Sequence, residues 1–402
     1  MLSALESVRE ELLAGLEPVG QEVVPLVAAA GRVMAISPRA RTALPPFDNS
    51  AMDGYAVRAA DLGTVPVALW LRETVPAGGW PKSPVGAGET VRVFTGAPLP
   101  EGADAVVMQE DTEPDPEDPG RIRFLTPVKP WEHVRFRGED VNLDAPLVPE
   151  GRVLDAAALA LLAAAGVHEV AVFRQPLVVI RVTGDELAVA GMPLKPGQIH
   201  ESNAIMLTAL IRSVGGLADV TPPLPDDADA LRAALETAAA GADLVVTAGG
   251  ASVGDHDLVR RVITDAGGVV QDWRIAIKPG KPLFHGRLAG RPVLGVPGNP
   301  VSAFVTAVLL VLPALRRLQG MRDVLPPETP GVLAATLANP EPRRHFMRVH
   351  CDRSGRVRSA GPQASHRLAS LAAANGLVDV PPGAVLAPGT TVPVIRWGSC
   401  VA

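Results

Sequence analysis

The sequence is poor in cysteine, in aromatic residues and in basic charge. Among its 402 residues only Cys351 and Cys400 are cysteines, which excludes a disulfide framework and a zinc site built on paired cysteines. Two thiols fit a reducing compartment. Aromatic residues make up 3% of the chain and the formal net charge is −6. A base-stacking surface and a basic nucleic-acid-binding stripe are therefore not expected.

Long apolar runs are also scarce. Residues 305–312 come closest, but this run is short and Pro313 follows it, whereas a bilayer-spanning helix needs about 20 apolar residues. Glu6, Glu10 and Glu11 interrupt the segment where the apolar part of a signal peptide would lie. We therefore expect a cytoplasmic protein with neither a membrane nor a nucleic acid as partner.

The most informative stretch lies near the middle of the chain. Residues 244–247 are apolar or β-branched without alternation, which is typical of a buried strand. Gly249 and Gly250 follow and permit a sharp turn, and Ser252 and Asp255 come next. Either these residues only turn the chain and cap a helix, or they form a site for a phosphate carried with a divalent metal.

The same pattern of strand, turn and helix recurs around this stretch. Residues 177–182 and 293–296 are also predicted strands, and residues 203–214 and 226–241 are predicted helices. This alternation predicts a mostly parallel α/β sheet, in which ligands bind at the carboxyl ends of the strands. Two of the turns expected there contain Thr183, Gly184, Asp185 and Glu186, and Pro297, Gly298, Asn299 and Ser302.

Residues 65–141 have the pattern of a small β domain, with short apolar runs separated by turn residues. A polar turn with Asp48 and Asp53 precedes it, and Thr95 and Asp140 follow two of its strands. Turn residues of this kind are often only surface. Here, however, the first turn brings two carboxylates, an amide and a hydroxyl next to the chain's single tyrosine.

Two helices flank this β domain in the sequence. Ser3 and Glu6 have the spacing of a capping box, and the apolar residues after them predict an amphipathic helix that buries one face, for example on a second subunit. Asp155 can cap a second helix that stops at Gly166. We expect the two helices to pack together in one discontinuous linking domain.

Basic residues occur at two further places. Lys278 and Lys281 belong to a Lys-Pro-Gly-Lys-Pro loop, in which the prolines restrict the backbone and the lysines can converge on an anion. Arg343, Arg348 and Ser365 form a second polar group near the C-terminus. A solvated loop and an ordinary polar surface are the alternatives.

These motifs together resemble one protein family, the molybdopterin molybdotransferases or MoeA proteins, whose eukaryotic relatives include the gephyrin E domain. The matching motifs occur in the family's order and cover nearly the whole chain: residues 46–56, 94–98, 137–140, 183–187, 249–255, 278–282, 297–300 and 365–366. One departure is the doublet Arg343-Arg344, which leaves open which arginine faces the site.

The resemblance implies a multidomain α/β plus β architecture. It has a central, mostly parallel α/β domain like the molybdopterin adenylyltransferases, an inserted β domain, a helical linking domain and a C-terminal β-barrel. We assign residues 1–43 and 142–175 to the linking domain, 44–141 to the β domain, 176–325 to the central molybdopterin-binding domain and 326–402 to the barrel. A homodimer with its active site at the subunit interface is implied.

The resemblance also implies an activity, the insertion of molybdate into adenylylated molybdopterin with release of AMP, assisted by Mg²⁺ or a similar divalent cation. Other proteins of molybdenum cofactor biosynthesis, including the molybdopterin adenylyltransferase, are the expected partners. The alternatives are that the chain is itself an adenylyltransferase or a gephyrin-like scaffold. Loss of the acidic and lysine motifs would suit a scaffold, but all of them are present.

The implied site residues fall into three groups. The expected catalytic residues are Asp48, Asp53, Asp140, Glu186 and Asp243. The expected metal ligands are Asp185, Glu186 and Asp255. The expected substrate-binding residues are Thr95, Thr183, Gly184, Gly249, Gly250, Ser252, Lys278, Lys281, Pro297, Gly298, Asn299, Ser302, Arg343, Arg348 and Ser365.

Overall fold

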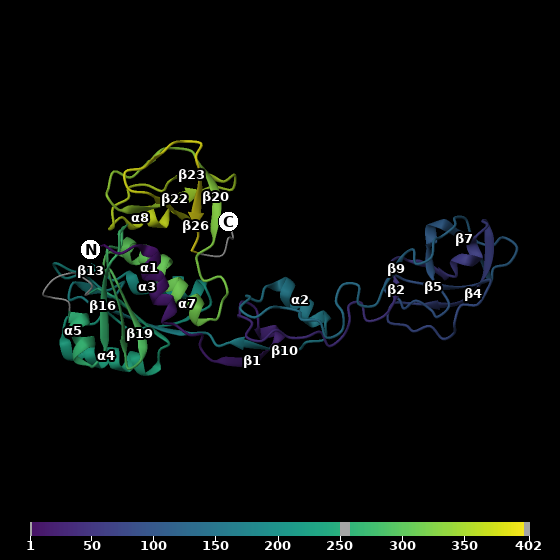
Figure 1. Ribbon diagram of the computed structural model, residues 1–402, viewed down its shortest axis with the longest axis horizontal. Coiled ribbons are helices and arrows are strands. Elements are labelled where there is room, and N and C mark those ends of the chain that lie inside the picture. Colours follow the sequence, from purple (N-terminus) through teal and green to yellow (C-terminus); the bar gives the residue numbers. More distant parts are fainter. Residues whose placement is uncertain (1, 250–257, 398–402) are drawn as a thin grey trace.

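The structure, a computed structural model, describes residues 2–249 and 258–397. A central α/β domain and a C-terminal barrel lie at one end of an elongated molecule, and a β domain lies at the other (Figure 1). A linking portion connects the two ends. This is the architecture that the resemblance predicted.

The central domain is built on a six-stranded sheet with the order β14-β11-β15-β19-β18-β16. The first four strands are parallel, and the last two run antiparallel to their neighbours. The strands are β11 (Leu177–Val182), β14 (Leu217–Val220), β15 (Leu244–Ala248), β16 (Val269–Arg274), β18 (Pro282–Leu288) and β19 (Arg291–Val296). The predicted, mostly parallel sheet is therefore confirmed.

Helices cover both faces of this sheet. Alternate residues of β11 point to opposite faces, so Ile180 packs in one core cluster and Val179 in another. One face carries α3 (Asn203–Ser213) and the long helix that begins with α6 (Pro300–Thr306). The other face carries α4 (Ala228–Gly241) and α5 (Leu258–Asp265).

The long helix differs from the sequence expectation. It runs without interruption from Pro300 to Leu318, through the π-helical segment Ala307–Val311 and α7 (Leu312–Leu318). Pro313 does not end it, because Pro313 lies in the first turn of α7, after a π-helical turn that changes the hydrogen-bond spacing. The helix is long and apolar enough to cross a membrane, but 94% of its apolar window is buried inside the protein.

The N-terminal helix α1 (Leu5–Ala14) is amphipathic as predicted, but two expectations about it are wrong. Its N-cap residue is Ala4, without a side-chain hydrogen bond, so Ser3 and Glu6 do not form a capping box. Its apolar residues, Leu5 among them, pack in the central domain's core together with α7, not against the second helix. Its apolar face is therefore covered within the same chain.

The linking portion has its own small core. The antiparallel strands β1 (Gln21–Pro25) and β10 (Glu169–Phe173) form its ribbon, beside the 3-10 turn Leu26–Ala28. Helix α2 (Ala156–Ala164) covers it. The predicted cap of α2 is confirmed, because the Asp155 carboxylate accepts a hydrogen bond from the Ala158 backbone nitrogen at 2.7 Å.

The β domain contains a six-stranded sheet with the order β6-β3-β5-β4-β8-β7. Its two core clusters lie among these strands and the loops beside them. The strands are β3 (Gly54–Val57), β4 (Val67–Val75), β5 (Glu89–Val93), β6 (Ala105–Met108), β7 (Thr112–Pro114) and β8 (Arg121–Phe124). The 3-10 turns are Ala59–Leu62 and Gln109–Asp111, and a separate ribbon pairs β2 (Asn49–Ser50) with β9 (Val134–Arg135).

The C-terminal part forms a closed five-stranded barrel, because β22 pairs with both β23 and β24. Its strands are β20 (Glu328–Leu333), β22 (Arg344–Cys351), β23 (Arg356–Ser359), β24 (Gly376–Val380) and β26 (Thr391–Ile395). A short strand of the central domain, β17 (Ile277–Lys278), extends this sheet by pairing with β22. The remaining elements are the ribbons β12 (Leu187–Ala188) with β13 (Ile199–His200) and β21 (Leu337–Ala338) with β25 (Val385–Leu386), and α8 (Leu368–Ala372).

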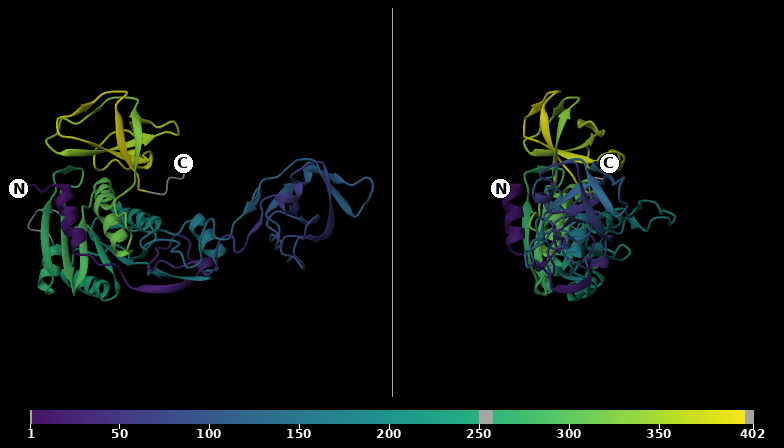
Figure 2. Two further views of the ribbon diagram at one scale, coloured as in Figure 1. Left: turned by 45° about the vertical axis from the view of Figure 1, so that its right-hand side comes forward. Right: turned by 90° about the vertical axis from the view of Figure 1, so that its right-hand side faces the viewer.

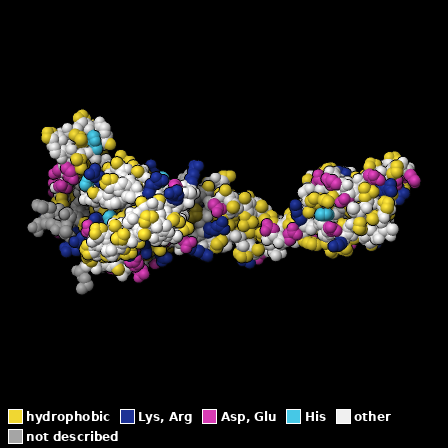
Figure 3. Space-filling view, turned by 90° about the horizontal axis from the view of Figure 1, so that it is seen from above, with side chains coloured by type: hydrophobic (Ala, Val, Ile, Leu, Met, Phe, Trp, Pro, Cys, Tyr) yellow, Lys and Arg dark blue, Asp and Glu magenta, His cyan; other side chains and the backbone are white. Residues whose placement is uncertain are grey.

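The long axis of the molecule separates the β domain from the central domain. The two stay apart when the molecule is turned (Figure 2), and seen from above a narrow neck joins the β domain to the rest (Figure 3). Side chains of the β domain and of the central sheet therefore do not meet within one chain.

Candidate active site

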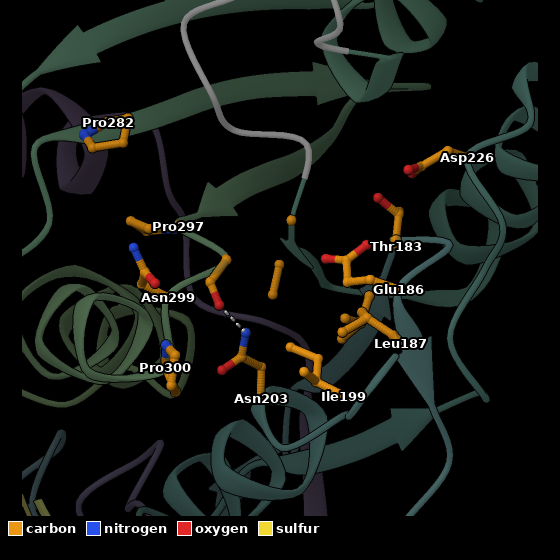
Figure 4. Close-up of a pocket in the computed structure, with 15 residues that line it drawn as sticks. Thr183, Glu186, Leu187, Ile199, Asn203, Asp226, Pro282, Pro297, Asn299 and Pro300 are labelled. Atoms are coloured by element: carbon orange, nitrogen blue, oxygen red, sulfur yellow. Dashed lines mark hydrogen bonds between the residues drawn. The ribbon is translucent and has the colours of Figure 1, made fainter. Parts of the chain in front are cut away.

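A cleft of about 540 Å³ lies at the carboxyl ends of β11, β15 and β19. The turns after these three neighbouring strands line it, as the sequence predicted for ligands of a parallel sheet (Figure 4). Seven predicted site residues are brought together here: Thr183, Gly184, Glu186, Gly249, Pro297, Gly298 and Asn299.

Two glycines allow the turns to approach one another. Gly249 has a φ of +96°, and a Cβ atom built on it would lie 2.5 Å from the backbone oxygen of Thr183. Gly184 has a φ of +153°, and the Glu186 carboxylate would meet its Cβ at 2.5 Å. A side chain at Gly249 would therefore push two of the lining turns apart.

Two carboxylates lie on the β11 side of the cleft. Glu186 points toward Thr183, and Asp226 lies beside them (Figure 4). Asp226 is a lining residue that sequence reasoning assigned only to the start of a helix. Asp185 is not among the lining residues, and its carboxylate accepts a hydrogen bond from the Asp226 backbone nitrogen at 3.1 Å. It thereby holds the Asp226 turn in place.

The N-terminus of the long helix forms the opposite wall of the cleft. Asn299 is its N-cap residue and makes no side-chain capping bond, and Pro300 occupies the first turn. Pro300 has no N–H and the Val301 N–H is bonded to Ser365, so this helix end favours an anion chiefly through the partial positive charge of the helix dipole. Ser302 is buried in the same turn, and the backbone oxygen of Ser365 accepts a hydrogen bond from the Val301 nitrogen at 3.2 Å. Ser365 therefore lies beside this helix end.

Asn203 lines the cleft without having been predicted as a site residue. Its side-chain Nδ2 donates to the backbone oxygen of Gly298 at 2.7 Å, so the first residue of α3 holds the turn after β19 (Figure 4). Only a hydrogen bond between residues 95 positions apart reveals this role. The sequence contains no local signal for it.

The two lysines of the Lys-Pro-Gly-Lys-Pro loop have different surroundings. Lys278 is half-buried and donates to the Glu341 carboxylate at 3.0 Å, and this hydrogen bond lowers the pKa of Glu341. Lys281 is exposed. Gly280 packs the loop against the long helix, because a Cβ there would lie 2.6 Å from the Thr306 hydroxyl. The loop is thus fixed beside the helix end that faces the cleft.

The structure separates the roles of the arginines near the barrel. Arg343 donates to the backbone oxygen of Ile277 at 2.9 Å, beside the lysine loop. Arg344 instead pairs with Glu6 and Asp379, which raises the pKa of its guanidinium. Of the two residues in the doublet, Arg343 therefore lies by the lysine loop.

Arg348 is fully buried, which does not fit the expected direct contact with a substrate. It donates to the backbone oxygens of Pro362 at 2.7 Å and Ala364 at 3.2 Å, and to the Ser370 hydroxyl at 3.1 Å. Its position supports the segment that precedes Ser365.

The expected carboxylates of the β domain are exposed and lie far from this cleft. Asp53 accepts hydrogen bonds from the backbone nitrogen and from the hydroxyl of Thr95, both at 2.8 Å, and these bonds lower the pKa of Asp53. Asp48 accepts one from the Arg137 nitrogen at 2.7 Å, and the nitrogen of Asp140 donates to Leu44. These contacts fix the turns that carry the three carboxylates, which the resemblance groups as the carboxylate wall of the β domain.

Asp243 lies at the other end of β15 from the cleft. Its carboxylate is bound by the Arg174 guanidinium through two hydrogen bonds of 2.8 and 2.9 Å. The structure therefore does not bring it to the carboxyl ends of the strands, and the grouping of Asp243 with the catalytic residues is not supported by its position. Three other predicted residues, Gly250, Ser252 and Asp255, lie outside the described residues.

The cleft offers few protein ligands for a divalent metal. Within residues 2–249 and 258–397, no three His, Cys, Asp or Glu side chains are grouped as a metal site. Mg²⁺, however, is commonly held by one or two carboxylates together with phosphate oxygens of the substrate. Glu186 and Asp226 supply two carboxylates on one wall of the cleft, so the donor set fits a metal that arrives with a phosphate.

Comparison with known families gives three matches along the chain. Residues 3–166 match the MoeA N-terminal region (domain I and II), residues 179–317 match a probable molybdopterin binding domain, and residues 330–397 match the MoeA C-terminal region (domain IV).

The chain belongs to the MoeA family. It is 40% identical over 395 residues to "Molybdopterin molybdenumtransferase 2" of Mycobacterium tuberculosis, and the match covers 96% of each chain. It is 37% identical over 382 residues to the molybdopterin molybdenumtransferase of Haemophilus influenzae, covering 92% of each. These relatives extend the MoeA match over almost the whole chain.

A solved structure supports the same family at the level of the fold. The molybdopterin biosynthesis MoeA protein of Pyrococcus horikoshii OT3 superposes with a TM-score of 0.86 at 30% identity, covering 98% of this chain and 100% of that one. The match includes the β domain and the barrel. Both lie outside the part that matches the probable molybdopterin binding domain, so the MoeA family does not favour the adenylyltransferase alternative.

Proposed function

We propose that this protein is a molybdopterin molybdotransferase of molybdenum cofactor biosynthesis. It inserts molybdate into adenylylated molybdopterin and releases AMP. Two observations support this function: membership of the MoeA family, and a cleft with carboxylates that suit a divalent cation on one side and a helix end that suits an anion on the other. A scaffold would not need such a cleft.

The cleft supplies separate places for the parts of the substrates. The turns after β11, β15 and β19 and the N-terminus of the long helix hold the phosphate-bearing pterin, because the positive end of the helix dipole favours anions. Lys278, Lys281, Arg343 and Ser365 bind molybdate, a tetrahedral dianion that needs charged and hydrogen-bonding donors. Lys281, which is exposed beside this helix end, makes the main contact.

A divalent cation, Mg²⁺, would be held by Glu186 with Asp226, and it would neutralise the charge that develops on the departing phosphate. Asp185 supports these two residues through the turn of Asp226. Asp255 stays a predicted ligand. Within residues 2–249 and 258–397 no cysteine lies at the cleft, since Cys351 is buried in the barrel core.

The active site is completed by a second copy of the chain. The cleft and the carboxylate wall of the β domain, with Asp48, Asp53 and Asp140, lie at opposite ends of one elongated molecule. In a two-fold dimer the β domain of each copy closes the cleft of the other, and two-fold dimers are the commonest oligomers. We therefore propose a cytoplasmic homodimer that receives its substrate from the molybdopterin adenylyltransferase.

The activity is tested by following AMP release from adenylylated molybdopterin. The purified protein should release AMP only when molybdate is present. Release without molybdate would point to a hydrolase, formation of adenylylated molybdopterin from ATP would point to the adenylyltransferase, and no release under any condition would leave a scaffold.

The shared site is tested by mixing two inactive variants. Glu186→Ala damages the cleft and Asp53→Ala damages the wall of the β domain, so a mixed dimer keeps one undamaged site. Random exchange of equal amounts should restore about a quarter of the wild-type activity, because half of the two-fold dimers are then mixed. Two variants that stay inactive after verified subunit exchange would show that each site belongs to one chain.

A further inference from the structure

The junction between the linking portion and the central domain carries an ion pair outside the cleft. The Nη1 and Nη2 atoms of Arg174 donate to the two carboxylate oxygens of Asp243 at 2.9 and 2.8 Å. Arg174 follows β10 of the linking portion, and Asp243 precedes β15 of the central sheet. A two-pronged contact of this kind fixes direction as well as distance.

Asp243 is firmly held on the central side. It is 8% exposed, its carboxylate also accepts a hydrogen bond from the Leu177 nitrogen at 2.8 Å, and its own nitrogen donates to the Leu177 oxygen at 2.8 Å. The carboxylate is therefore a fixed point at the base of the central sheet.

Arg174 is held on the side of the linking portion. Its backbone nitrogen donates to the oxygen of Gly20 at 2.7 Å. Gly20 directly precedes β1, the strand that pairs antiparallel with β10. The hydrogen bond with Asp243 raises the pKa of its guanidinium. Within the described residues no other ion pair crosses this junction.

Apolar packing at this junction includes a small cluster in which Met321 packs on Phe173. A cavity of about 300 Å³ lies here, lined by residues 15–20 together with Arg174, Asp243, Arg287 and Leu318. The backbone bond from the Val19 nitrogen to the Leu318 oxygen, 2.8 Å long, gives a pivot beside it. The ion pair lines this cavity and adds a directional contact to the small apolar cluster of the junction.

We propose that Arg174 and Asp243 are positioning residues that set the angle at which the linking portion leaves the central domain. This inference rests on the proposed function, in which the β domain at the far end must reach the cleft of the partner copy. A small rotation at the base becomes a large displacement at the tip of an elongated arm. Asp243 thus acts on the reaction from the opposite end of β15, without touching a substrate.

The test is Arg174→Ala in the full-length dimer, with small-angle X-ray scattering and steady-state kinetics. Arg174 is the residue to change, because its removal leaves the Leu177 hydrogen bond to Asp243 intact. The distribution of intramolecular distances should broaden. The kcat for AMP release should fall about tenfold, since a misplacement of about 1 Å can cost up to about 100-fold. KM for adenylylated molybdopterin should change less than about twofold, because the cleft is intact.

Two further variants keep the test specific. Arg152→Ala removes an ion pair with Asp155, of 3.3 Å, that lies wholly within the linking portion, and it should leave both the scattering and kcat at wild-type values. Arg174→Lys keeps the charge but not the two-pronged contact, and should restore kcat only in part. A thermal melt of Arg174→Ala shows whether a loss comes from general instability, because its removal leaves the buried Asp243 carboxylate without a cation.

The proposal is overturned if Arg174→Ala keeps the wild-type scattering and kcat, or if it raises KM while kcat stays the same. The proposed function fails differently, because then the wild-type protein itself shows no molybdate-dependent AMP release. In that case the scattering of Arg174→Ala still decides whether the ion pair sets the angle.

Discussion

The cleft of the central domain and the carboxylate wall of the β domain differ in how their polar groups are held. In the cleft, turns from three adjacent strands converge, and each turn is fixed by contacts with another turn or helix, such as the bond from Asn203 to Gly298. On the wall, Asp48 and Asp53 are fixed within the β domain itself, by Arg137 and Thr95. Each half is ordered without the other.

This difference indicates that the cleft and the carboxylate wall can each fold first and meet only when two chains associate. Neither half depends on the other for its geometry, so association of two chains has little to reorganise, and preorganised groups lose less entropy on binding. In the proposed dimer the cleft would hold the substrates, and the exposed carboxylates of the wall would act only after docking. Substitutions on the two sides should therefore have different kinetic signatures.

The largest effect is expected for Glu186→Ala, which removes one of the two carboxylates that line the cleft. Glu186 is exposed in a turn, so its removal should change stability by less than about 0.5 kcal/mol. Turnover should fall by about 100-fold or more, as for the loss of one electrostatic stabiliser of a transition state. Molybdate-dependent AMP release and a thermal melt measure the two quantities.

Glu236→Ala is the matched control, because Glu236 is an exposed glutamate on α4, away from the residues that line the cleft. It should retain full turnover. Wild-type turnover in Glu186→Ala would remove Glu186 from the mechanism and leave Asp226 as the carboxylate of interest.

A smaller effect is expected for Lys281→Ala, which separates molybdate binding from pterin binding within the cleft. Losing one hydrogen bond to a charged group costs about 1.5–3 kcal/mol, which is about ten- to a hundredfold in affinity. The molybdate concentration for half-maximal turnover should rise by that factor, and excess molybdate should restore much of the rate.

Lys195→Ala, in an exposed loop, serves as the control for loss of one positive charge. If Lys281→Ala instead weakens binding of the adenylylated pterin and leaves the molybdate dependence unchanged, Lys281 belongs to the phosphate and not to molybdate.

The smallest effect is expected on the wall, for Thr95→Val. The Thr95 backbone nitrogen and hydroxyl both stabilise the ionised Asp53 carboxylate and lower its pKa. Removing the hydroxyl should raise the pKa of Asp53, so the acid limb of the pH–activity profile moves to higher pH while activity at neutral pH is nearly unchanged.

The lowered pKa of Asp53 also affects the stability of the folded protein in a pH-dependent way. Asp53 has a lower pKa in the folded protein, so its contribution is present above the unfolded pKa and is lost as the pH falls through the folded pKa. Thr112→Val removes a β-domain hydroxyl that bonds to the Gln109 oxygen, and should leave the profile in place. An unchanged acid limb in Thr95→Val would show that another group controls it.

The strands and helices of the central domain could be predicted because their signals are local. The strand at residues 177–182 was found from its apolar run, and the start of α4 from Asp227, whose carboxylate accepts from the Ala230 nitrogen at 2.8 Å. The three turns of the cleft followed from the rule that ligands bind at the carboxyl ends of parallel strands.

What could not be predicted depends on contacts between distant parts of the chain. Periodicity shows that α1 buries one face, but not that the covering surface is α7. The pairing of Lys278 with Glu341 joins residues 63 positions apart. Asp243 precedes the strand that Gly249 follows, so β15 places the two at opposite ends of the sheet although they are close in sequence.

The long buried helix has a consequence for synthesis of the protein. Residues 300–318 would pass for a membrane segment while they are unfolded. Most of the elements that cover them, including α1, α3 and the strands β11, β15 and β19, precede them in the chain, whereas α8 and the barrel residues Phe346 and Trp397 follow them. Because folding during synthesis proceeds from the N-terminal side, the ribosome releases this helix when most of its cover already exists. The order of the sequence thus shortens the time for which the apolar segment is exposed.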